Sequence, residues 1–375
     1  MNDRIRIATV YSKNWLPLTN MAAIRWVKIS EALAALGFQV DMIANTDNGI
    51  VQKSANLRLV PYEMTRWDEY DVIKTLFDRG FENLIQSGGG DHPFVISKLG
   101  SVVGRDDSTE GVYFFGKIRE KLFEIQTAIA EKSRYVTVLT APSRDLWIET
   151  FGQKQNLLLV PGAAERCIPE PRVNPYSCFS EPITLYAGHI YDGSQPEINL
   201  LWKQRLNRLG GLLRKKGIRL CFIGTGDTEG LDQKIVTYLG PVEYDGIWDY
   251  HYFANAAIVL GQGQVQHNES TKIYYYIRTG LPVVSESSIP NNHLIGDANL
   301  GFIANYGDDH QMIEMVEAAI YRKWDREQAI RYILENHTWN RRGRVYEAVI
   351  KTELGVTVSK LNSRDDTDLR IPSDT

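Results

Sequence analysis

A polar loop, a short helix and a buried strand follow one another in the stretch His267-Asn-Glu-Ser-Thr-Lys-Ile-Tyr-Tyr-Tyr-Ile-Arg-Thr-Gly-Leu-Pro-Val-Val-Ser-Glu286. Ser270 and Thr271 are favourable N-cap residues, and the apolar residues after them recur at the three- and four-residue spacing of one helix face. Gly280 ends this helix. Because Pro282 is tolerated at the start of a strand but not inside one, the apolar residues after it predict a short parallel strand.

Lys272 lies in the first turn of the predicted helix, where a positive charge is unfavourable. The helix dipole favours anions at this end by roughly 0.3–1 kcal/mol. A bound phosphate would remove the conflict, because free backbone N–H groups, the hydroxyls of Ser270 and Thr271 and the lysine ammonium could all hold it. The alternative is a surface lysine on an ordinary helix of an α/β domain.

The run from Thr271 to Val284 resembles the donor-binding signature of GT-B glycosyltransferases, which is a lysine, two residues, an acidic residue, a tyrosine and then Gly-x-Pro-Val-Val. The wider layout, over roughly residues 4 to 350, is similar to the large retaining family 4. In that family the lysine stabilises the departing nucleotide diphosphate, and the acidic residue holds the ribose hydroxyls. The chain departs from the pattern, since the two family glutamates fall on His267 and Tyr275.

The resemblance implies an α/β fold of two Rossmann-like, doubly wound domains that face each other across a cleft. Residues 1–165 would form the acceptor-binding domain, and the proline-rich residues 166–182 the linker. Residues 183–337 would form the nucleotide-sugar-binding domain, and a helix at 338–354 would cross back to the first domain. Residues 355–375 are polar and without periodicity, which predicts a disordered tail.

Donor-binding candidates are the turns that end predicted strands of the second half, the polar loop before Lys272 and its helix. The set is Gly188, His189, Gly224, Thr225, Gly226, Val242, His267, Asn268, Ser270, Thr271, Lys272, Tyr275, Tyr276 and Glu286. His189 stands where the family has an arginine, and it could equally be a packing residue. The polar loop could equally be solvated.

Acceptor-binding candidates follow the predicted strands of the first half, at the sheet edge where ligands bind in open parallel sheets. They are Asn14, Trp15, Asn20, Lys98 and Arg105. The loop at residues 12–20 is not glycine-rich, which argues against a nicotinamide-dependent enzyme. Asp106 and Asp107 are the candidate catalytic bases, because an inverting transferase needs one carboxylate to take the acceptor proton.

Composition and charge exclude several classes of protein. The 375 residues carry a net charge of -4, so no overall field recruits nucleic acid. Three cysteines without Cys-x-x-Cys spacing argue against a disulfide framework or a structural zinc site, and a reducing cytoplasm fits best. The sequence contains no run of 18 apolar residues, so it predicts no membrane span. Peripheral contact with a membrane is a remaining alternative. The basic residues at 205–216 are expected to form a solvated face.

The sequence therefore predicts a glycosyltransferase that moves a sugar from a nucleotide-diphosphate sugar to a hydroxyl of a glycan, a lipid-linked acceptor or a small molecule. Lys272 would stabilise the leaving diphosphate, so neither a bound metal nor a cofactor is expected. Family analogy implies retention of configuration, with inversion as the second choice. Two other classes remain open: a GT-B sugar-nucleotide epimerase and a non-catalytic sugar-binding protein.

Overall fold

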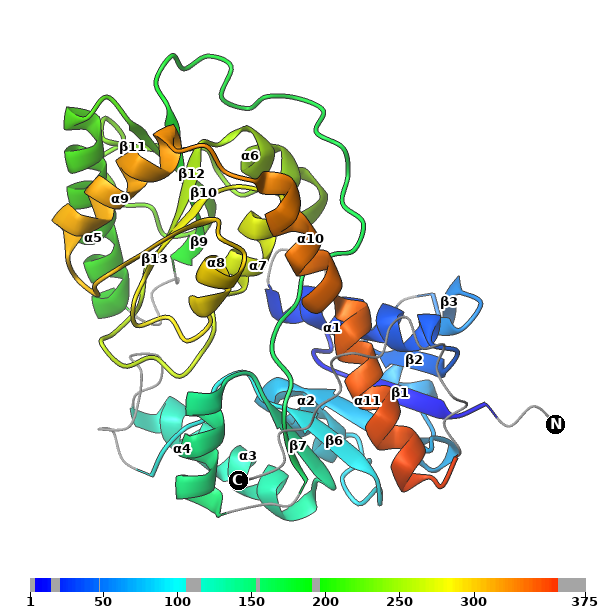
Figure 1. The fold of residues 1–375 in the computed structure, drawn as a ribbon. Helices are drawn as coiled ribbons and strands as arrows, with labels where there is room; N and C mark the ends of the chain where they lie inside the picture. Colours follow the sequence, from blue (N-terminus) through cyan, green and yellow to red (C-terminus); the bar gives the residue numbers. More distant parts are fainter. Residues whose placement is uncertain are drawn as a thin grey trace.

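The chain folds around two separate β-sheets, as the computed structural model in Figure 1 shows. The structure describes residues 4–14, 21–46, 48–105, 116–152, 156–190 and 196–356. Helices pack on both faces of each sheet, so the predicted α/β class with two doubly wound sheets is confirmed. None of the described helices is long and apolar enough to cross a membrane.

The first sheet has eight strands in the order β3-β4-β2-β1-β5-β6-β7-β8, all paired in parallel except β3 and β4. The strands are β1 (Arg6–Val10), β2 (Gln39–Ile43), β3 (Val51–Ser54), β4 (Leu57–Val60), β5 (Val72–Leu76), β6 (Val95–Lys98), β7 (Tyr135–Val138) and β8 (Leu157–Leu159). Its helices are α1 (Met21–Ala35), α2 (Phe77–Gln86), α3 (Gly116–Lys132) and α4 (Ala141–Phe151).

The second sheet has six strands in the order β11-β10-β9-β12-β13-β14, all paired in parallel. The strands are β9 (Ile183–Ile190), β10 (Arg219–Gly226), β11 (Val236–Tyr238), β12 (Ala256–Val259), β13 (Val283–Glu286) and β14 (Gly301–Ala304). Its helices are α5 (Pro196–Lys215), α6 (Ile247–Phe253), α7 (Thr271–Arg278), α8 (His293–Asp297), α9 (Asp309–Tyr321) and α10 (Arg326–Asn336).

Strand order reverses once in each sheet. β1 lies between β2 and β5, and β9 lies between β10 and β12, so successive strands are added first on one side and then on the other. In open parallel sheets, ligands bind at the carboxyl ends of the strands beside such a reversal. The fold therefore provides two candidate binding edges, one at β1 and β5 and the other at β9 and β12.

Both faces of each sheet are buried, which explains the nearly continuous apolar strands. In the first sheet, Ile7 and Val72 pack on the face covered by α1, whereas Ala8 and Ile73 pack into the core of the opposite face. The strands β3, β4 and β11 and the helix α8 are absent from the sequence-based expectations. The first three are only three or four residues long, and α8 has five residues, so each is too short for a repeated pattern to be recognised in the sequence.

The chain passes between the two sheets twice. Residues 165–182 contain no helix or strand, and they connect β8 to β9. After α10, helix α11 (Trp339–Glu353) returns to the first sheet and packs beside α1 (Figure 1). Gly343 allows the close approach of these helices, because a Cβ atom there would lie 3.2 Å from both Ala32 Cβ and Leu36 Cδ1.

We expect Gly343→Val to loosen α11 from α1, because the added methyl groups have no free space and overpacking of this kind costs roughly 1–3 kcal/mol. Thermal unfolding should occur at a lower temperature than in the wild type. Gly211→Val on α5 is the matched control, since a Cβ atom at Gly211 meets nothing within 4 Å. An equal loss of stability in both variants would contradict tight packing at Gly343.

Candidate functional site

The loop of residues 262–270, part of the connection from β12 to α7, contacts residues of the first half. The hydroxyls of Thr140 and Ser143 both donate to the His267 carbonyl oxygen, the latter at 2.8 Å. Asn268 Nδ2 donates to Ser101 Oγ at 2.5 Å. These contacts fix the loop against the carboxyl-end side of the first sheet.

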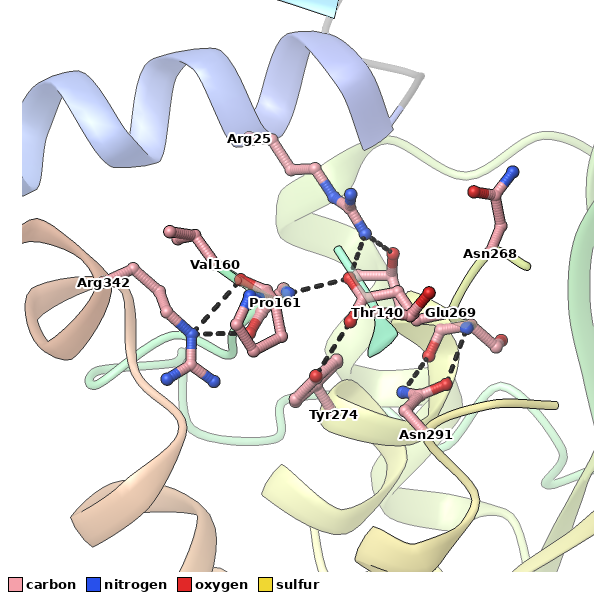
Figure 2. Close-up of polar contacts among 12 residues, drawn as sticks. Arg25, Thr140, Val160, Pro161, Asn268, Glu269, Tyr274, Asn291 and Arg342 are labelled. Carbon is pink, nitrogen blue, oxygen red and sulfur yellow. Dashed lines mark hydrogen bonds and ion pairs between the residues drawn. The ribbon is translucent and has the colours of Figure 1, made fainter. Parts of the chain in front are cut away.

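Glu269 of this loop is buried and contacts residues of both halves of the chain (Figure 2). Its carboxylate accepts hydrogen bonds from Arg25 at 2.8 Å, from the Gly162 backbone N–H at 2.7 Å and from the Tyr274 hydroxyl at 2.9 Å. The Glu269 side chain is 0% exposed and that of Arg25 is 7% exposed. A buried carboxylate is tolerated only with such partners, so Arg25 and Glu269 form a charge pair that joins the two halves of the protein.

The start of α7 is fixed from both sides. Arg25 also donates to Thr271 Oγ1 at 2.5 Å. On the other side, Asn291 accepts from the Ser270 N–H at 2.8 Å and donates to the Ser270 carbonyl at 2.9 Å. The first turn of α7, with Lys272 in it, therefore has a single position relative to both sheets.

Lys272 is the uncompensated cation at this position. It is half-buried and makes no hydrogen bond or ion pair with any residue that the structure describes. Its ammonium lies 5.7 Å from the centre of the Tyr186 ring, and burial lowers the pKa of Lys272 to about 8. The buried Ser270 hydroxyl likewise has no partner in the described part of the chain. A cation and a hydroxyl without partners are suited to an anionic ligand.

The Tyr186 ring connects Lys272 to the carboxyl end of β9. It lies close to the Lys272 ammonium, and it also contacts Gly188. His189 and Thr225 are paired across these strands, and their side chains are 2.6 Å apart. Gly224 packs closely on the neighbouring strand, because a Cβ atom there would lie 1.6 Å from the Gly188 carbonyl oxygen. At Gly226, a Cβ atom would likewise lie 1.5 Å from the Ile190 carbonyl oxygen. Strand pairing itself requires both glycines.

Several buried polar atoms around the loop have no hydrogen-bond partner among the described residues. They are Gln262 Oε1, His267 Nδ1, Asn268 Oδ1 and Ser288 Oγ. Beside them, at the carboxyl ends of β13 and β14, lies a concavity of about 530 Å³ lined by Gln264, Ser287, Ser288, Asn305 and Tyr306. Buried polar atoms are nearly always paired, so this region is suited to water or a polar ligand.

Comparison with known proteins identifies the fold through structure alone. No protein-family model matches the sequence, and no curated protein does. Among solved structures, sucrose-phosphate synthase from Thermosynechococcus elongatus is 15% identical, with a TM-score of 0.67 over 94% of this chain and 100% of that one. HepE from Anabaena, in complex with UDP and glucose, is 12% identical, with a TM-score of 0.67 over 93% and 100%. WaaG, a glycosyltransferase involved in lipopolysaccharide biosynthesis, is 15% identical, with a TM-score of 0.59 over 93% and 99%.

The chain has the GT-B fold. In the second GT-B domain, Lys272 and Gly188 both lie against the Tyr186 ring, and His189 pairs with Thr225 at the ends of the neighbouring strands. His267 and Asn268 belong to the loop that contacts the first domain. Of the predicted donor residues, the structure thus places Lys272 and Gly188 against one ring, and His267 and Asn268 in contact with the first domain.

Three other predicted donor residues are packing residues in this GT-B structure. Tyr276 is 0% exposed, and its hydroxyl accepts from the Ala187 N–H at 3.0 Å. Tyr275 is buried against Trp248, with ring centres 5.4 Å apart. Val242 packs against the core of the second sheet. An apolar or aromatic side chain at these positions gains more from burial than from solvent contact.

Glu286 is also wrong as a donor ligand. It ends β13 as expected, but it is 0% exposed. Its carboxylate is paired with Arg205 and accepts from the Gly261 and Gly307 N–H groups at 2.6 and 2.8 Å. Arg205 also lies 3.4 Å from Asp309, so this arginine belongs to a buried ion-pair network and not to a solvated basic face.

The residues predicted to bind the acceptor or to act as its base differ in their surroundings. Asn14 is exposed after β1, and its Oδ1 accepts from Asn45 Nδ2 at 3.2 Å. Arg105 donates twice to the Thr150 carbonyl, at 3.1 and 3.0 Å, and so closes the end of α4. Lys98, the last residue of β6, is buried and donates to the Val160 carbonyl, so it is not placed as an acceptor ligand. Trp15, Asn20, Asp106 and Asp107 lie outside the described residues.

Asp78 is a candidate that the sequence analysis missed. It directly follows Phe77, which has a left-handed φ of 58° at the carboxyl end of β5, beside the strand reversal. Gln126 Nε2 donates to Asp78 Oδ1 and to the Ser101 carbonyl, both at 2.9 Å, and burial raises the pKa of Asp78 to about 6. Strained backbone and a shifted pKa both concentrate at functional sites. A carboxylate directly after a buried strand was the available signal in the sequence.

The charge pair between Arg25 and Glu269 should show strong coupling in a double-mutant cycle. Arg25→Met or Glu269→Gln alone should destabilise the protein by roughly 3–5 kcal/mol, since each leaves an uncompensated buried charge. The double variant should lose much less than the sum, as measured by denaturant unfolding. The exposed pair Lys216 and Glu317 is the control, and its coupling should be close to zero because solvent screens it. Additive losses at Arg25 and Glu269 would contradict the pair.

Proposed function

We propose that this protein is a glycosyltransferase that moves a sugar from a nucleotide-diphosphate sugar to a hydroxyl acceptor. The observation that carries the proposal is Lys272, a half-buried cation without a hydrogen-bond or ion-pair partner among the described residues, at the first turn of α7. The GT-B fold supports it, because the structure of HepE contains UDP and glucose.

The donor diphosphate would bind between the start of α7 and the ends of β9 and β10. Lys272 and the Ser270 hydroxyl would contact the phosphates, and His189 would approach from the strand ends. As the bond between sugar and phosphate breaks, negative charge grows on the leaving diphosphate. A fixed cation in a desolvated site stabilises that charge by several kcal/mol, so we propose that transfer does not require a divalent metal.

The acceptor would bind on the side of the first domain, near Asp78. Because the pKa of Asp78 is about 6, its carboxylate is mostly deprotonated at neutral pH and could take the proton of an acceptor hydroxyl. A direct displacement assisted by such a base inverts the anomeric configuration. Retention follows from family analogy alone, so Asp78 favours the inverting alternative.

Lys272→Ala should lower kcat/KM for transfer by about two or more orders of magnitude, because it removes the charge opposite the diphosphate. In the wild type, kcat/KM should also fall as the pH rises through about 8, where the free Lys272 loses its proton. Lys215 is an exposed lysine on α5, and Lys215→Ala is the control. It should leave kcat/KM and its pH dependence unchanged. Undiminished turnover in Lys272→Ala would remove this lysine from the mechanism. Thermal-shift screening of nucleotide diphosphates identifies the donor to use.

Asp78→Asn should remove the rise in kcat/KM with pH that the wild type shows through about 6, and it should slow transfer by roughly 10²–10⁴-fold. NMR of the product would give the anomeric configuration. Asp71→Asn, an exposed aspartate just before β5, is the control. An unchanged pH profile, or a retained configuration, would exclude Asp78 as the base.

A further inference from the structure

A small cavity lies in the first domain between the sheet, α1 and α11. Its volume is about 20 Å³, and its wall includes four cationic side chains, Arg25, Lys74, Lys98 and Arg342. None of the four residues is more than 8% exposed. Burial of four cations around one cavity is costly unless their charges are balanced.

Carboxylates balance only one of these charges. Arg25 is paired with Glu269, and no other carboxylate of the described residues lies within ion-pair distance of the four. Arg342 donates to the carbonyls of Pro161 and Gly162 at 3.2 and 3.0 Å, and these acceptors carry no net charge. Lys98 donates to one further backbone carbonyl.

Lys74 is the extreme case. It is 2% exposed in the middle of β5, and it makes no hydrogen bond or ion pair with the part of the chain that the structure describes. Its ammonium instead makes a cation–π contact with the Tyr346 ring, whose centre lies 4.3 Å away. An aromatic face partly stabilises a cation, but it does not neutralise it.

Two events could relieve this excess of charge. The lysines could lose their protons, and burial indeed lowers the pKa of Lys74 to about 7 and that of Lys98 well below its usual value. The arginines keep their charge at any ordinary pH. The second event is uptake of an anion into the cavity, which would let Lys74 and Lys98 stay protonated.

We propose that this cavity binds one chloride-sized monovalent anion between Lys74 and Lys98. The volume suits one atom-sized guest, because a single water needs roughly 10–15 Å³ on the same measure and polyatomic anions such as phosphate need several times more. Leu76 and Leu139 are among the apolar residues of the wall, and a spherical, weakly hydrated anion tolerates such neighbours. The inference does not depend on the proposed glycosyl transfer.

The site would also support the joint between the domains. Arg25 and Gly162 line the cavity, and the same two residues donate to the Glu269 carboxylate. A bound anion would offset the repulsion among the four cations around Arg25. We therefore expect anion binding to stabilise the whole protein and not the first domain alone.

Thermal unfolding of the full chain tests the site, with sodium chloride or bromide compared against sodium gluconate at equal ionic strength. At pH 6.5 the halides should raise Tm in a saturable way, since a ligand that binds only the folded state stabilises it. At pH 9 the effect should be small, because the lysines are then neutral in the fold. In gluconate, stability should rise between pH 7 and about 10, because the unfolded chain keeps the Lys74 proton that the folded chain releases.

Lys74→Met should abolish the halide effect at pH 6.5, whereas Lys216→Met, at an exposed position, should keep it. Equal Tm values in halide and gluconate for the wild type, or a halide effect that survives in Lys74→Met, would overturn the proposal. If Lys74→Met does not fold, wild-type crystals soaked in bromide decide the question. An anomalous peak in the cavity supports the site, and a peak only elsewhere or none refutes it.

Discussion

The buried charge pair of Arg25 and Glu269 is the interaction on which the arrangement of this protein depends. It joins α1 of the first domain to the loop before α7 of the second, over 244 positions of sequence. Its carboxylate is also held by the Gly162 backbone and by Tyr274, so Glu269 occupies one position only. Since Lys272 follows three residues later, the proposed diphosphate site takes its geometry from a contact between domains.

The sequence predicted most of the fold, because the long helices and buried strands carry clear periodic patterns. It also identified the start of α7, where Ser270, Thr271 and Lys272 lie as expected. It failed where one residue type has two uses. A glutamate at the end of a strand can face a ligand or a buried arginine, and only the position of Arg205 on α5 distinguishes these for Glu286. Tyr276 is a second example. Its hydroxyl could face a ligand, but it accepts a hydrogen bond from the Ala187 backbone.

Long-range pairing limits prediction of the site in a second way. Glu269 belongs to the motif that the sequence analysis quoted, but nothing local indicates that its partner is Arg25. The same holds for Lys74, which the sequence presents as an ordinary strand residue, and for Lys98, which was expected to face an acceptor. Their unusual surroundings come from α11, a helix that is more than 200 residues away in sequence and closes over the sheet. Tertiary packing alone creates this cluster of charge.

The two chain crossings between the domains meet at one point. Ala164 and Thr338 form an isolated parallel β-bridge, with the Ala164 N–H 2.8 Å from the His337 carbonyl. Beside it, Glu165 accepts from the Trp339 indole N–H at 3.1 Å. Any swing of one lobe against the other would pivot about this bridge, so its vicinity would move least. The contacts of the 262–270 loop with the first lobe, among them that of Asn268 with Ser101, lie away from this bridge, so such a swing would have to break them.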